Sequence, residues 1–167
     1  LDGQNTQEMI PILEAMKQYD VSVRFLEEMP FNGGSKTFNT IKWDYKNIFK
    51  HIADAYTNIE KLESPSTSTS INYKIRGHKG TFGLIPSFSR TFCGTCNRLR
   101  ISATGDVITC LYGKPSMNLR DVMRNENTEE NIKLHISKAI GSRAKTGFEA
   151  QKNHSSVFDS SMTSIGG

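Results

Sequence analysis

The segment MIPILEAMKQYDVSVRFL, residues 9–26, predicts the fold class, because a helical pattern changes to a strand pattern within it. Met9, Leu13 and Met16 are spaced three or four residues apart, which places them on one face of a helix. After Asp20 the apolar residues alternate, as in a short buried strand. A helix, a tight connection and a strand together form one repeat of a parallel α/β sheet or barrel.

This helix–strand unit cannot complete a parallel sheet alone, because a parallel strand needs a neighbouring strand. No strand pattern precedes the first helix. We therefore expect the neighbours of the strand to lie outside this chain or to come from a second copy. The loop of residues 29–34 follows the strand, where α/β folds place active-site groups, although it also fits a plain glycine-rich turn.

The remaining segments predict one helix, an antiparallel β section, two more helices and a polar tail. We expect Ile48, Ile52 and Ala55 to form the apolar face of the first of these helices. The residues from 141 onward show little apolar periodicity, so we expect an extended tail there. In chain order, the predictions are a helix at 43–58, a polar surface loop at 63–70, strands at 71–76 and 79–85, a hairpin at 98–102 and 106–110, and helices at 118–124 and 128–140.

Composition narrows the class of protein. The chain has 167 residues, and 21 Lys and Arg against 17 Asp and Glu give a net charge of +4. Basic residues form no long run and are not interleaved with aromatic ones, so we expect no nucleic acid partner. No apolar run approaches the roughly 20 residues of a membrane span. Three cysteines make an odd and sparse set, which favours a reducing compartment such as the cytoplasm over a disulfide framework.

All three cysteines lie in FCGTCNRLRISATGDVITCLYG, residues 92–113. Cys93 and Cys96 form a CxxC pair, which brings two thiolates within reach of one metal centre. Thirteen residues separate Cys96 from Cys110, and the predicted hairpin would return the third thiol to the first two. The residues leave three alternatives open: an iron–sulfur cluster with one open iron, a zinc site, or thiols without metal. A fourth zinc ligand would be one of the histidines His51, His78, His135 and His154.

Two arginines follow the CxxC pair at alternate positions of the predicted strand. Arg98 and Arg100 would therefore point to the same side of that strand. Guanidinium groups beside thiolates offset their negative charge and bind carboxylates or phosphates through two hydrogen bonds. The alternative is a pair of arginines that are simply solvated.

At these residues the sequence resembles the MoaA family, the radical S-adenosylmethionine GTP cyclases that open molybdenum cofactor biosynthesis. FCGTCNRLRISATGDVITCLYG looks like the second-cluster motif of this family. The segment VRFLEEMPF resembles its late barrel strand, NLRDVMRN resembles the helix after the third cysteine, and the terminal double glycine resembles its carboxy terminus. Together these motifs cover most of the chain from about residue 6 onward.

The resemblance implies a role for each of the three thiols. Cys93, Cys96 and Cys110 would ligate a [4Fe–4S] cluster, and its open iron would bind the guanine of GTP. In the family, S-adenosylmethionine and a second [4Fe–4S] cluster generate a radical that starts the cyclisation of GTP between C8 of the base and C3′ of the ribose. The product is 3′,8-cyclo-7,8-dihydro-GTP.

The resemblance also implies contacts to the substrates. Arg98 and Arg100 would hold the triphosphate and ribose of GTP, and Arg24 matches another basic residue of the GTP pocket. Met29 matches a position that packs against S-adenosylmethionine. The partners implied are therefore GTP and S-adenosylmethionine, together with the barrel that precedes this portion in the family. We also expect a homodimer and no membrane partner.

The carboxy terminus resembles the family less closely. Gly166 and Gly167 match a double glycine that enters the active site, where the absence of side chains leaves room for substrate. The stretch NHSSVFDSSMTSIGG carries His154 and Met162 in the order that the family shows, with only approximate spacing.

The sequence departs from the family in one decisive feature. It contains no CxxxCxxC motif, and all three cysteines already belong to the second-cluster motif. We therefore expect this chain alone to bind one cluster at most and to show no turnover, although the family is enzymatic. In bacteria the enzyme would be cytoplasmic, and in eukaryotes it would lie in the mitochondrial matrix.

These observations combine into one expected architecture of the α/β class. Residues 1–34 would end an incomplete TIM-type barrel, residues 35–140 would form the cluster- and GTP-binding region around an antiparallel β module, and residues 141–167 would form the tail. The alternative function is a zinc-stabilised binding or interaction module without catalysis. In that case the cysteines would only hold the hairpin together through the bound zinc.

Overall fold

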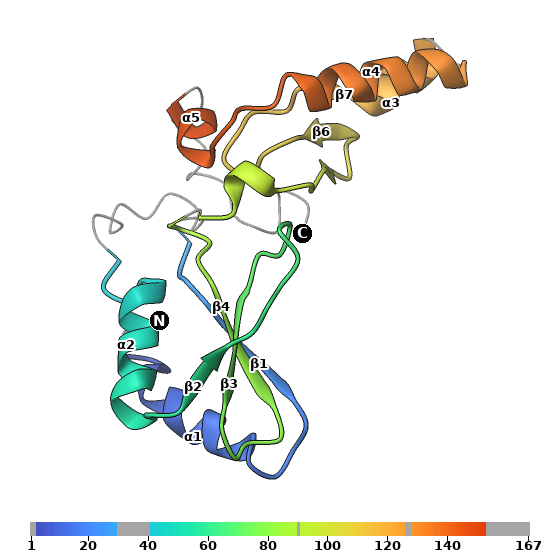
Figure 1. The fold of residues 1–167 in the computed structure, drawn as a ribbon. Coiled ribbons are helices and arrows are strands. Elements are labelled where there is room, and N and C mark those ends of the chain that lie inside the picture. Colours follow the sequence, from blue (N-terminus) through green and yellow to red (C-terminus); the bar gives the residue numbers. More distant parts are fainter. Residues whose placement is uncertain (1–2, 30–40, 90, 126–127, 153–167) are drawn as a thin grey trace. The chain divides into compact units, whose positions relative to one another are not determined.

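The structure is a computed structural model that describes residues 3–29, 41–89, 91–125 and 128–152 (Figure 1). The described residues up to Cys96 form one compact unit, and those from Asn97 onward form a second. The predicted α/β class is confirmed in its coarse form, because helices and two sheets occur together and no closed barrel is present among the described residues.

The first unit is built on a four-stranded mixed sheet with the strand order β1-β4-β3-β2. β1 runs parallel to β4, whereas β3 is antiparallel to both β4 and β2. The elements in chain order are the 3-10 helix η1 Thr6–Glu8, α1 Met9–Ala15, β1 Ser22–Leu26, α2 Tyr45–Ala55, β2 Ile59–Lys61, β3 Ile71–Ile75, β4 Thr81–Ile85 and the 3-10 helix η2 Cys93–Thr95.

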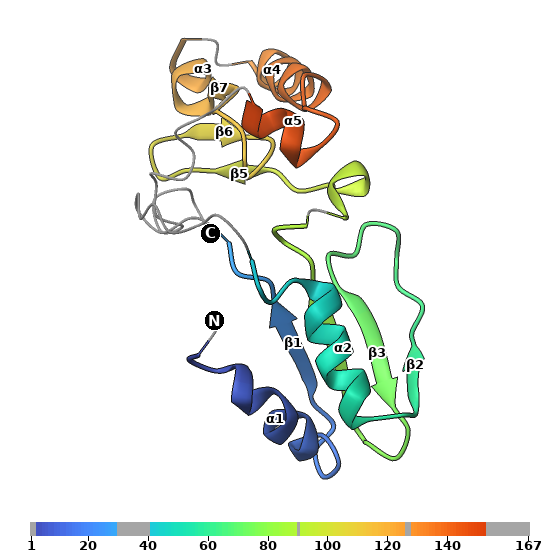
Figure 2. The ribbon, with the colours of Figure 1, turned by 90° about the vertical axis from the view of Figure 1, so that its left-hand side faces the viewer.

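Both α-helices of this unit pack on one face of the sheet and form its core (Figure 2). The predicted helix face of α1 is confirmed, because Met9, Leu13 and Met16 are all buried. Ile48 and Ile52 of α2 are buried as predicted. The core of buried residues is completed by Ile75, Phe82 and Leu84 from the strands.

Two details of α2 differ from the sequence prediction. The helix begins at Tyr45, not at residue 43, because the Asp44 carboxylate accepts a hydrogen bond from the backbone N–H of Asn47 at 2.8 Å and caps the helix. Ala55 is exposed, so the prediction of a buried Ala55 is wrong. The helix ends at this residue, which stays exposed although Ile52 in the same last turn is buried and Tyr56 packs against the core.

The expectation that the first strand finds no parallel partner within the chain is wrong. β4 pairs with β1 in parallel over five residues, from Ser22 opposite Thr81 to Leu26 opposite Ile85. The central part of β4 is buried, as is usual for a strand that has neighbours on both sides. The prediction that residues 71–110 form one antiparallel module is also wrong. β3 and β4 belong to the four-stranded sheet, whereas the strands of the hairpin belong to a second, three-stranded sheet.

The second unit contains a three-stranded antiparallel sheet in the order β5-β6-β7 and three helices. The predicted hairpin is confirmed, although its strands are shorter than expected. The elements are β5 Arg100–Ile101, β6 Asp106–Ile108, β7 Met117–Asn118, α3 Leu119–Asn125, α4 Glu129–Gly141 and α5 Gly147–Lys152. The Thr128 hydroxyl accepts a hydrogen bond from the Asn131 N–H at 3.4 Å and caps α4, as the sequence predicts.

The short helix α5 is absent from the sequence prediction, which placed an extended tail from residue 141 onward. α5 buries Gly147 and Ala150, two small residues that carry little apolar periodicity. A Cβ on Gly113 would lie 3.7 Å from the Cβ of Ala150, so the helix packs closely against that backbone. Small residues that permit close packing are hard to recognise from a hydrophobic pattern. In the part of the chain that the structure describes, no helix combines the length and the apolar character needed to cross a bilayer.

His78 is buried in the first unit without a hydrogen bond to either ring nitrogen among the described residues. Its ring packs edge-on against Tyr56 at a centroid distance of 5.4 Å. We expect His78→Phe to raise the free energy of unfolding by about 1–2 kcal/mol, because phenylalanine keeps the ring contact and removes two unsatisfied polar atoms. Urea unfolding followed by circular dichroism measures this change.

The matched control is His51→Phe. His51 also packs edge-on against an aromatic ring, that of Trp43, at 5.4 Å, but it is only half-buried. The control should change the free energy of unfolding by less than about 0.5 kcal/mol. A loss of stability in His78→Phe would show that its nitrogens have partners that stabilise the fold.

Candidate functional site

The CxxC pair lies on a tight turn at the end of the first unit. The backbone N–H of Cys96 donates to the carbonyl of Cys93 at 3.4 Å, and Thr95 donates to Phe92 at 3.3 Å. This 3-10 turn folds Cys96 back toward Cys93, as a pair of ligands to one metal centre requires. Both thiols are half-buried and neither is in a disulfide. A Cβ added to Gly94 would meet no described atom within 4 Å, so the turn presents open space at that position.

Cys110 belongs to the second unit, at the end of the hairpin. The hairpin turns at Gly105, whose φ of +93° lies in the left-handed region that favours glycine. The pairing ends with Arg100 opposite Ile108, two residues before Cys110. The Gly113 N–H then donates to the Cys110 carbonyl at 2.9 Å and closes a second turn. Cys110 is half-buried and is not in a disulfide.

The two arginines of the NRLR run lie in the same unit as Cys110. Arg100 is half-buried in β5, whereas Arg98 is exposed and precedes the strand. The predicted strand began at residue 98, whereas β5 begins two residues later, at Arg100. Both guanidinium groups lie on the segment that leads from the CxxC turn into the hairpin, which is where the sequence analysis placed them.

Arg24 lies on the face of the four-stranded sheet opposite to the one on which α1 and α2 pack, because it alternates with Val23 and Phe25, which face the core. It is paired with Gly83, which is in turn paired with Asn72 on the next strand. A Cβ on Gly83 would lie 2.9 Å from Cδ of Arg24 and 2.2 Å from Oγ of Ser70, so these side chains converge over the glycine. The Arg24 guanidinium donates to the carbonyl of the preceding residue at 3.2 Å and is exposed. Met29 follows β1 by three residues and is half-buried.

Glu27 is a buried, hydrogen-bonded acid of the first unit that sequence reasoning missed. It is 1% exposed, although it directly follows β1 and is preceded by an exposed leucine. One carboxylate oxygen accepts from the Tyr45 N–H at 2.6 Å and from the Ser89 hydroxyl at 2.7 Å. The other oxygen accepts from the N–H groups of Phe88 at 2.9 Å and Ser89 at 2.7 Å. The only signal in the sequence is an acidic pair after a strand, which does not distinguish Glu27 from Glu28.

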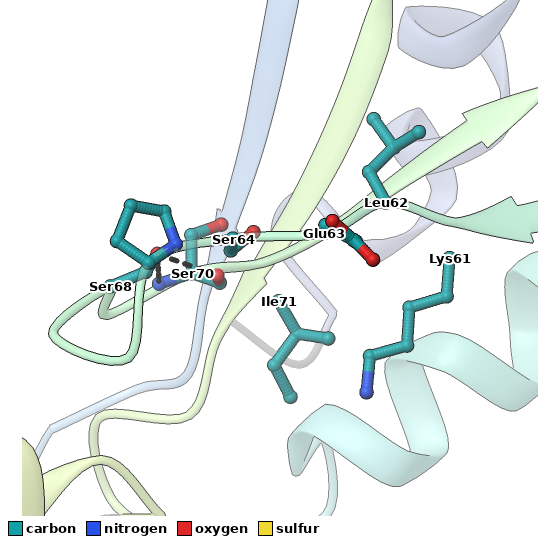
Figure 3. Close-up of a pocket in the computed structure, with 8 residues that line it drawn as sticks. Lys61, Leu62, Glu63, Ser64, Ser68, Ser70 and Ile71 are labelled. Atoms are coloured by element: carbon teal, nitrogen blue, oxygen red, sulfur yellow. Dashed lines mark hydrogen bonds between the residues drawn. The ribbon is translucent and has the colours of Figure 1, made fainter.

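A separate hollow of about 480 Å³ lies beside the loop between β2 and β3 (Figure 3). Lys61, Glu63 and Ile71 are among its lining residues. The Ser68 hydroxyl donates to the Ser70 carbonyl at 2.9 Å and thereby ties the polar loop to the start of β3 (Figure 3). The described residues that line this hollow include no cysteine and none of the arginines predicted to bind GTP, so it is not the candidate site.

Two of the histidines predicted as a fourth metal ligand pack against aromatic rings, and a third, His135, is half-buried in α4. His51 packs against Trp43 and His78 against Tyr56, each at a ring distance of 5.4 Å. Within the described ranges, no three or more His, Cys, Asp or Glu side chains gather in a group that could hold a metal ion. His154, Gly166 and Gly167 lie outside the described residues.

The turn of the hairpin is held by an acidic side chain. The Asp106 carboxylate accepts hydrogen bonds from the Thr104 hydroxyl at 2.6 Å and from the Asn118 amide at 2.9 Å. These bonds, a weaker one from Ser102 and the nearby charge of Arg120 hold the pKa of the Asp106 carboxyl below its usual value. The ionised form therefore stabilises the hairpin.

The lowered pKa of Asp106 predicts how the stability of the second unit changes with pH. The carboxyl binds a proton more weakly in the folded state, so its contribution to stability is present above the pKa of the unfolded chain and is lost as the pH falls through the lowered folded value. We expect Asp106→Asn to destabilise the second unit at neutral pH and to reduce its further loss of stability in acid. Urea midpoints measured from neutral to acidic pH test this, with Asp121→Asn as a control at an exposed position. An unchanged acid dependence in Asp106→Asn would contradict it.

Comparison with known proteins identifies the family. Residues 21–149 match the family described as Molybdenum Cofactor Synthesis C. The chain is 32% identical over all its residues to a GTP 3′,8-cyclase of Chlorobaculum tepidum and covers 49% of that protein. It is 36% identical over 86% of its length to molybdenum cofactor biosynthesis protein 1 of Mus musculus, of which it covers 22%.

A third relative, a GTP 3′,8-cyclase of Lactiplantibacillus plantarum, is 37% identical over 74% of the chain, which covers 37% of that protein. The chain thus spans about half the length, or less, of these relatives. The match includes β1, the CxxC turn and the hairpin, the segments on which the predicted resemblance depends. The chain therefore belongs to the molybdenum cofactor synthesis C family and corresponds to the carboxy-terminal portion of MoaA-type proteins, as its motifs predict.

Proposed function

We propose that this chain is the GTP-binding, carboxy-terminal part of a GTP 3′,8-cyclase, which acts in the first step of molybdenum cofactor biosynthesis. The observation that carries the proposal is the CxxC turn. Two half-buried thiols, Cys93 and Cys96, lie on one 3-10 turn inside the segment that matches the family. Relatives over this segment bear the name GTP 3′,8-cyclase.

The donor set fits an iron–sulfur cluster better than a closed zinc site. Cys93, Cys96 and Cys110 offer three thiolates, and the motif of residues 92–113 that contains them has no fourth cysteine and no histidine. A structural zinc normally has four protein ligands, whereas a [4Fe–4S] cluster with three cysteine ligands keeps one iron open. Such a cluster, when bound, would supply an open iron to the guanine of GTP.

The chain's own side chains bind and orient the rest of the nucleotide. Arg98 and Arg100 bind the triphosphate and ribose, because guanidinium groups form paired hydrogen bonds with phosphate oxygens. Arg24 contributes a further positive charge from β1, and Met29 contacts S-adenosylmethionine. Gly166 and Gly167 enter beside the substrate, where they leave space and add no side chain.

The longer protein supplies the remaining chemistry. S-adenosylmethionine and a second [4Fe–4S] cluster belong to the amino-terminal barrel of the family, and that barrel is a partner of this portion. We propose a homodimer in the cytoplasm, or in the mitochondrial matrix of a eukaryote. This chain alone binds GTP and does not turn it over.

Cluster and nucleotide binding can be separated by substitution. We expect anaerobic reconstitution to give brown protein with iron and acid-labile sulfide, and Cys96→Ser to lose most of both. Arg98→Ala and Arg100→Ala should keep the iron and weaken GTP binding by about tenfold or more, since one charged hydrogen-bonding group contributes about 1.5–3 kcal/mol. Iron and sulfide assays and calorimetric titration with GTP measure the two properties.

Arg124→Ala provides the control, because Arg124 is an exposed arginine in α3 of the same unit. It should leave both iron content and GTP affinity unchanged. Colourless protein with stoichiometric zinc and no sulfide would support a zinc-stabilised binding module instead. Loss of iron with unchanged GTP affinity in the two arginine variants would reverse the proposed roles.

A further inference from the structure

The carboxylate of Glu27 joins three segments of the first unit that are distant in the sequence. Glu27 itself follows β1, Tyr45 begins α2, and Phe88 and Ser89 follow β4. All four hydrogen bonds to the carboxylate are between 2.6 and 2.9 Å long, and the side chain is 1% exposed. A buried acid with this many ordered donors holds its neighbours in one arrangement.

The backbone of Glu27 strengthens the same connection. Its N–H donates to the Ile85 carbonyl at 3.1 Å, and its carbonyl accepts from the buried Ser87 hydroxyl at 2.8 Å. Ser87, Phe88 and Ser89 are therefore each bonded to one residue at the end of β1. The chain between β4 and the CxxC turn is thus anchored at three consecutive positions.

We propose that Glu27 is the positioning residue for the CxxC turn; this inference rests on the proposed function of Cys93 and Cys96 as cluster ligands. Only three residues separate Ser89 from Cys93. The turn contains local bonds within residues 92–96 and follows the anchored segment of residues 87–89 closely in the chain, so the position of that segment limits where the turn can lie.

The position of Glu27 directly after β1 explains why this anchor matters for ligand binding. Glu27 lies three residues after Arg24 and two before Met29, the residues of this strand end that the proposed function assigns to the two substrates. The same side chain therefore sets the placement of the CxxC turn relative to these residues within the first unit. Residues that orient metal ligands in this way affect metal retention without contacting the metal.

Two variants and a control test the role of Glu27. Glu27→Asp keeps the carboxylate but shortens the side chain by one methylene, so it cannot reach Tyr45 and Ser89 together. Ser89→Ala removes a single hydroxyl donor, the one 2.7 Å from the carboxylate. Ser22→Ala, the control, removes a hydroxyl bonded to Thr81 at 3.0 Å at the opposite end of β1.

The first measurement is the rate at which the reconstituted whole chain loses iron to a chelator. We expect Glu27→Asp to accelerate the loss by about 10-fold or more and Ser89→Ala by about 3-fold or more, with the Ser22→Ala control unchanged. The second measurement is the rate of alkylation of each cysteine by iodoacetamide in metal-free protein, resolved by mass spectrometry. Cys93 and Cys96 should react faster in both variants, while Cys110 in the other unit keeps its rate.

The two measurements separate the inference from the proposed function. If the unsubstituted chain binds no iron, the proposed function fails, and alkylation of Cys93 and Cys96 still decides whether Glu27 positions the turn. Unchanged rates in folded Glu27→Asp and Ser89→Ala would overturn the inference, as would an equal rise at Cys110, which would indicate general loosening. If Glu27→Asp does not fold by circular dichroism, the rates of Ser89→Ala alone support or overturn the inference.

Discussion

Replacing Glu27 with glutamine is expected to lower the free energy of unfolding of the first unit by about 2–4 kcal/mol. Glutamine has nearly the same shape, but only one of its terminal atoms accepts hydrogen bonds. One oxygen of Glu27 faces the N–H of Tyr45, and the other faces the N–H groups of Phe88 and Ser89. Backbone N–H groups cannot become acceptors, so the glutamine NH₂ would face a donor in either orientation.

Urea unfolding of the metal-free chain measures this effect without any contribution from a bound cluster. Glu28→Gln is the matched control, since it makes the same chemical change at the adjacent, half-buried position. We expect the control to lower the free energy of unfolding by less than about 0.5 kcal/mol. Equal values for the two variants would mean that the bonds to the Glu27 carboxylate contribute little to the fold.

The second large effect is expected for Gly80→Ala, with a cost of about 2–4 kcal/mol. A Cβ on Gly80 would lie 2.3 Å from the backbone oxygen of Val21 and 3.1 Å from that of Tyr19. Backbone atoms cannot rotate away as a side chain can. The Gly80 N–H also donates to the Met16 carbonyl at 3.1 Å, so a shift that relieves the clash would disturb the junction between α1 and β4.

Thermal unfolding of the metal-free chain compares this variant with Gly94→Ala. A methyl group on Gly94 meets no described atom within 4 Å, so this control should change stability by less than about 0.5 kcal/mol. If Gly80→Ala unfolds at the same temperature as the control, the close approach of β4 to the α1–β1 connection does not constrain the fold.

Elements whose signals lie close together in the sequence were predicted well. The buried face of α1, the cap of α4 at Thr128 and the hairpin turn at Gly105 follow from residues within four positions of one another. The CxxC spacing and the motifs around it were also sufficient to predict the family, which the match over residues 21–149 confirms. The roles of Arg24, Arg98, Arg100 and Met29 stay predictions, as do the domain boundaries.

Features that depend on distant residues were predicted poorly. Ala55 has the right spacing for the buried face of α2, but the helix ends there and leaves it exposed. The parallel partner of β1 lies in the same chain, more than fifty residues later, and the strand pattern of residues 79–85 does not specify which strand lies beside it. α5 buries small residues, Gly147 and Ala150, which do not form a recognisable hydrophobic pattern in the sequence.

The sequence alone determined the α/β class, most of the helices, the longer strands, the thiol set and the family, because each depends on the spacing of residues that are close together in the chain. It did not show β2, β7 or α5. The tertiary structure decided that β1 pairs with β4 and that Glu27, not Glu28, becomes the buried acid. The donors to the Glu27 carboxylate lie 18, 61 and 62 residues away along the chain. No local pattern specifies contacts at such separations, since they form only when the sheet brings its strand ends together.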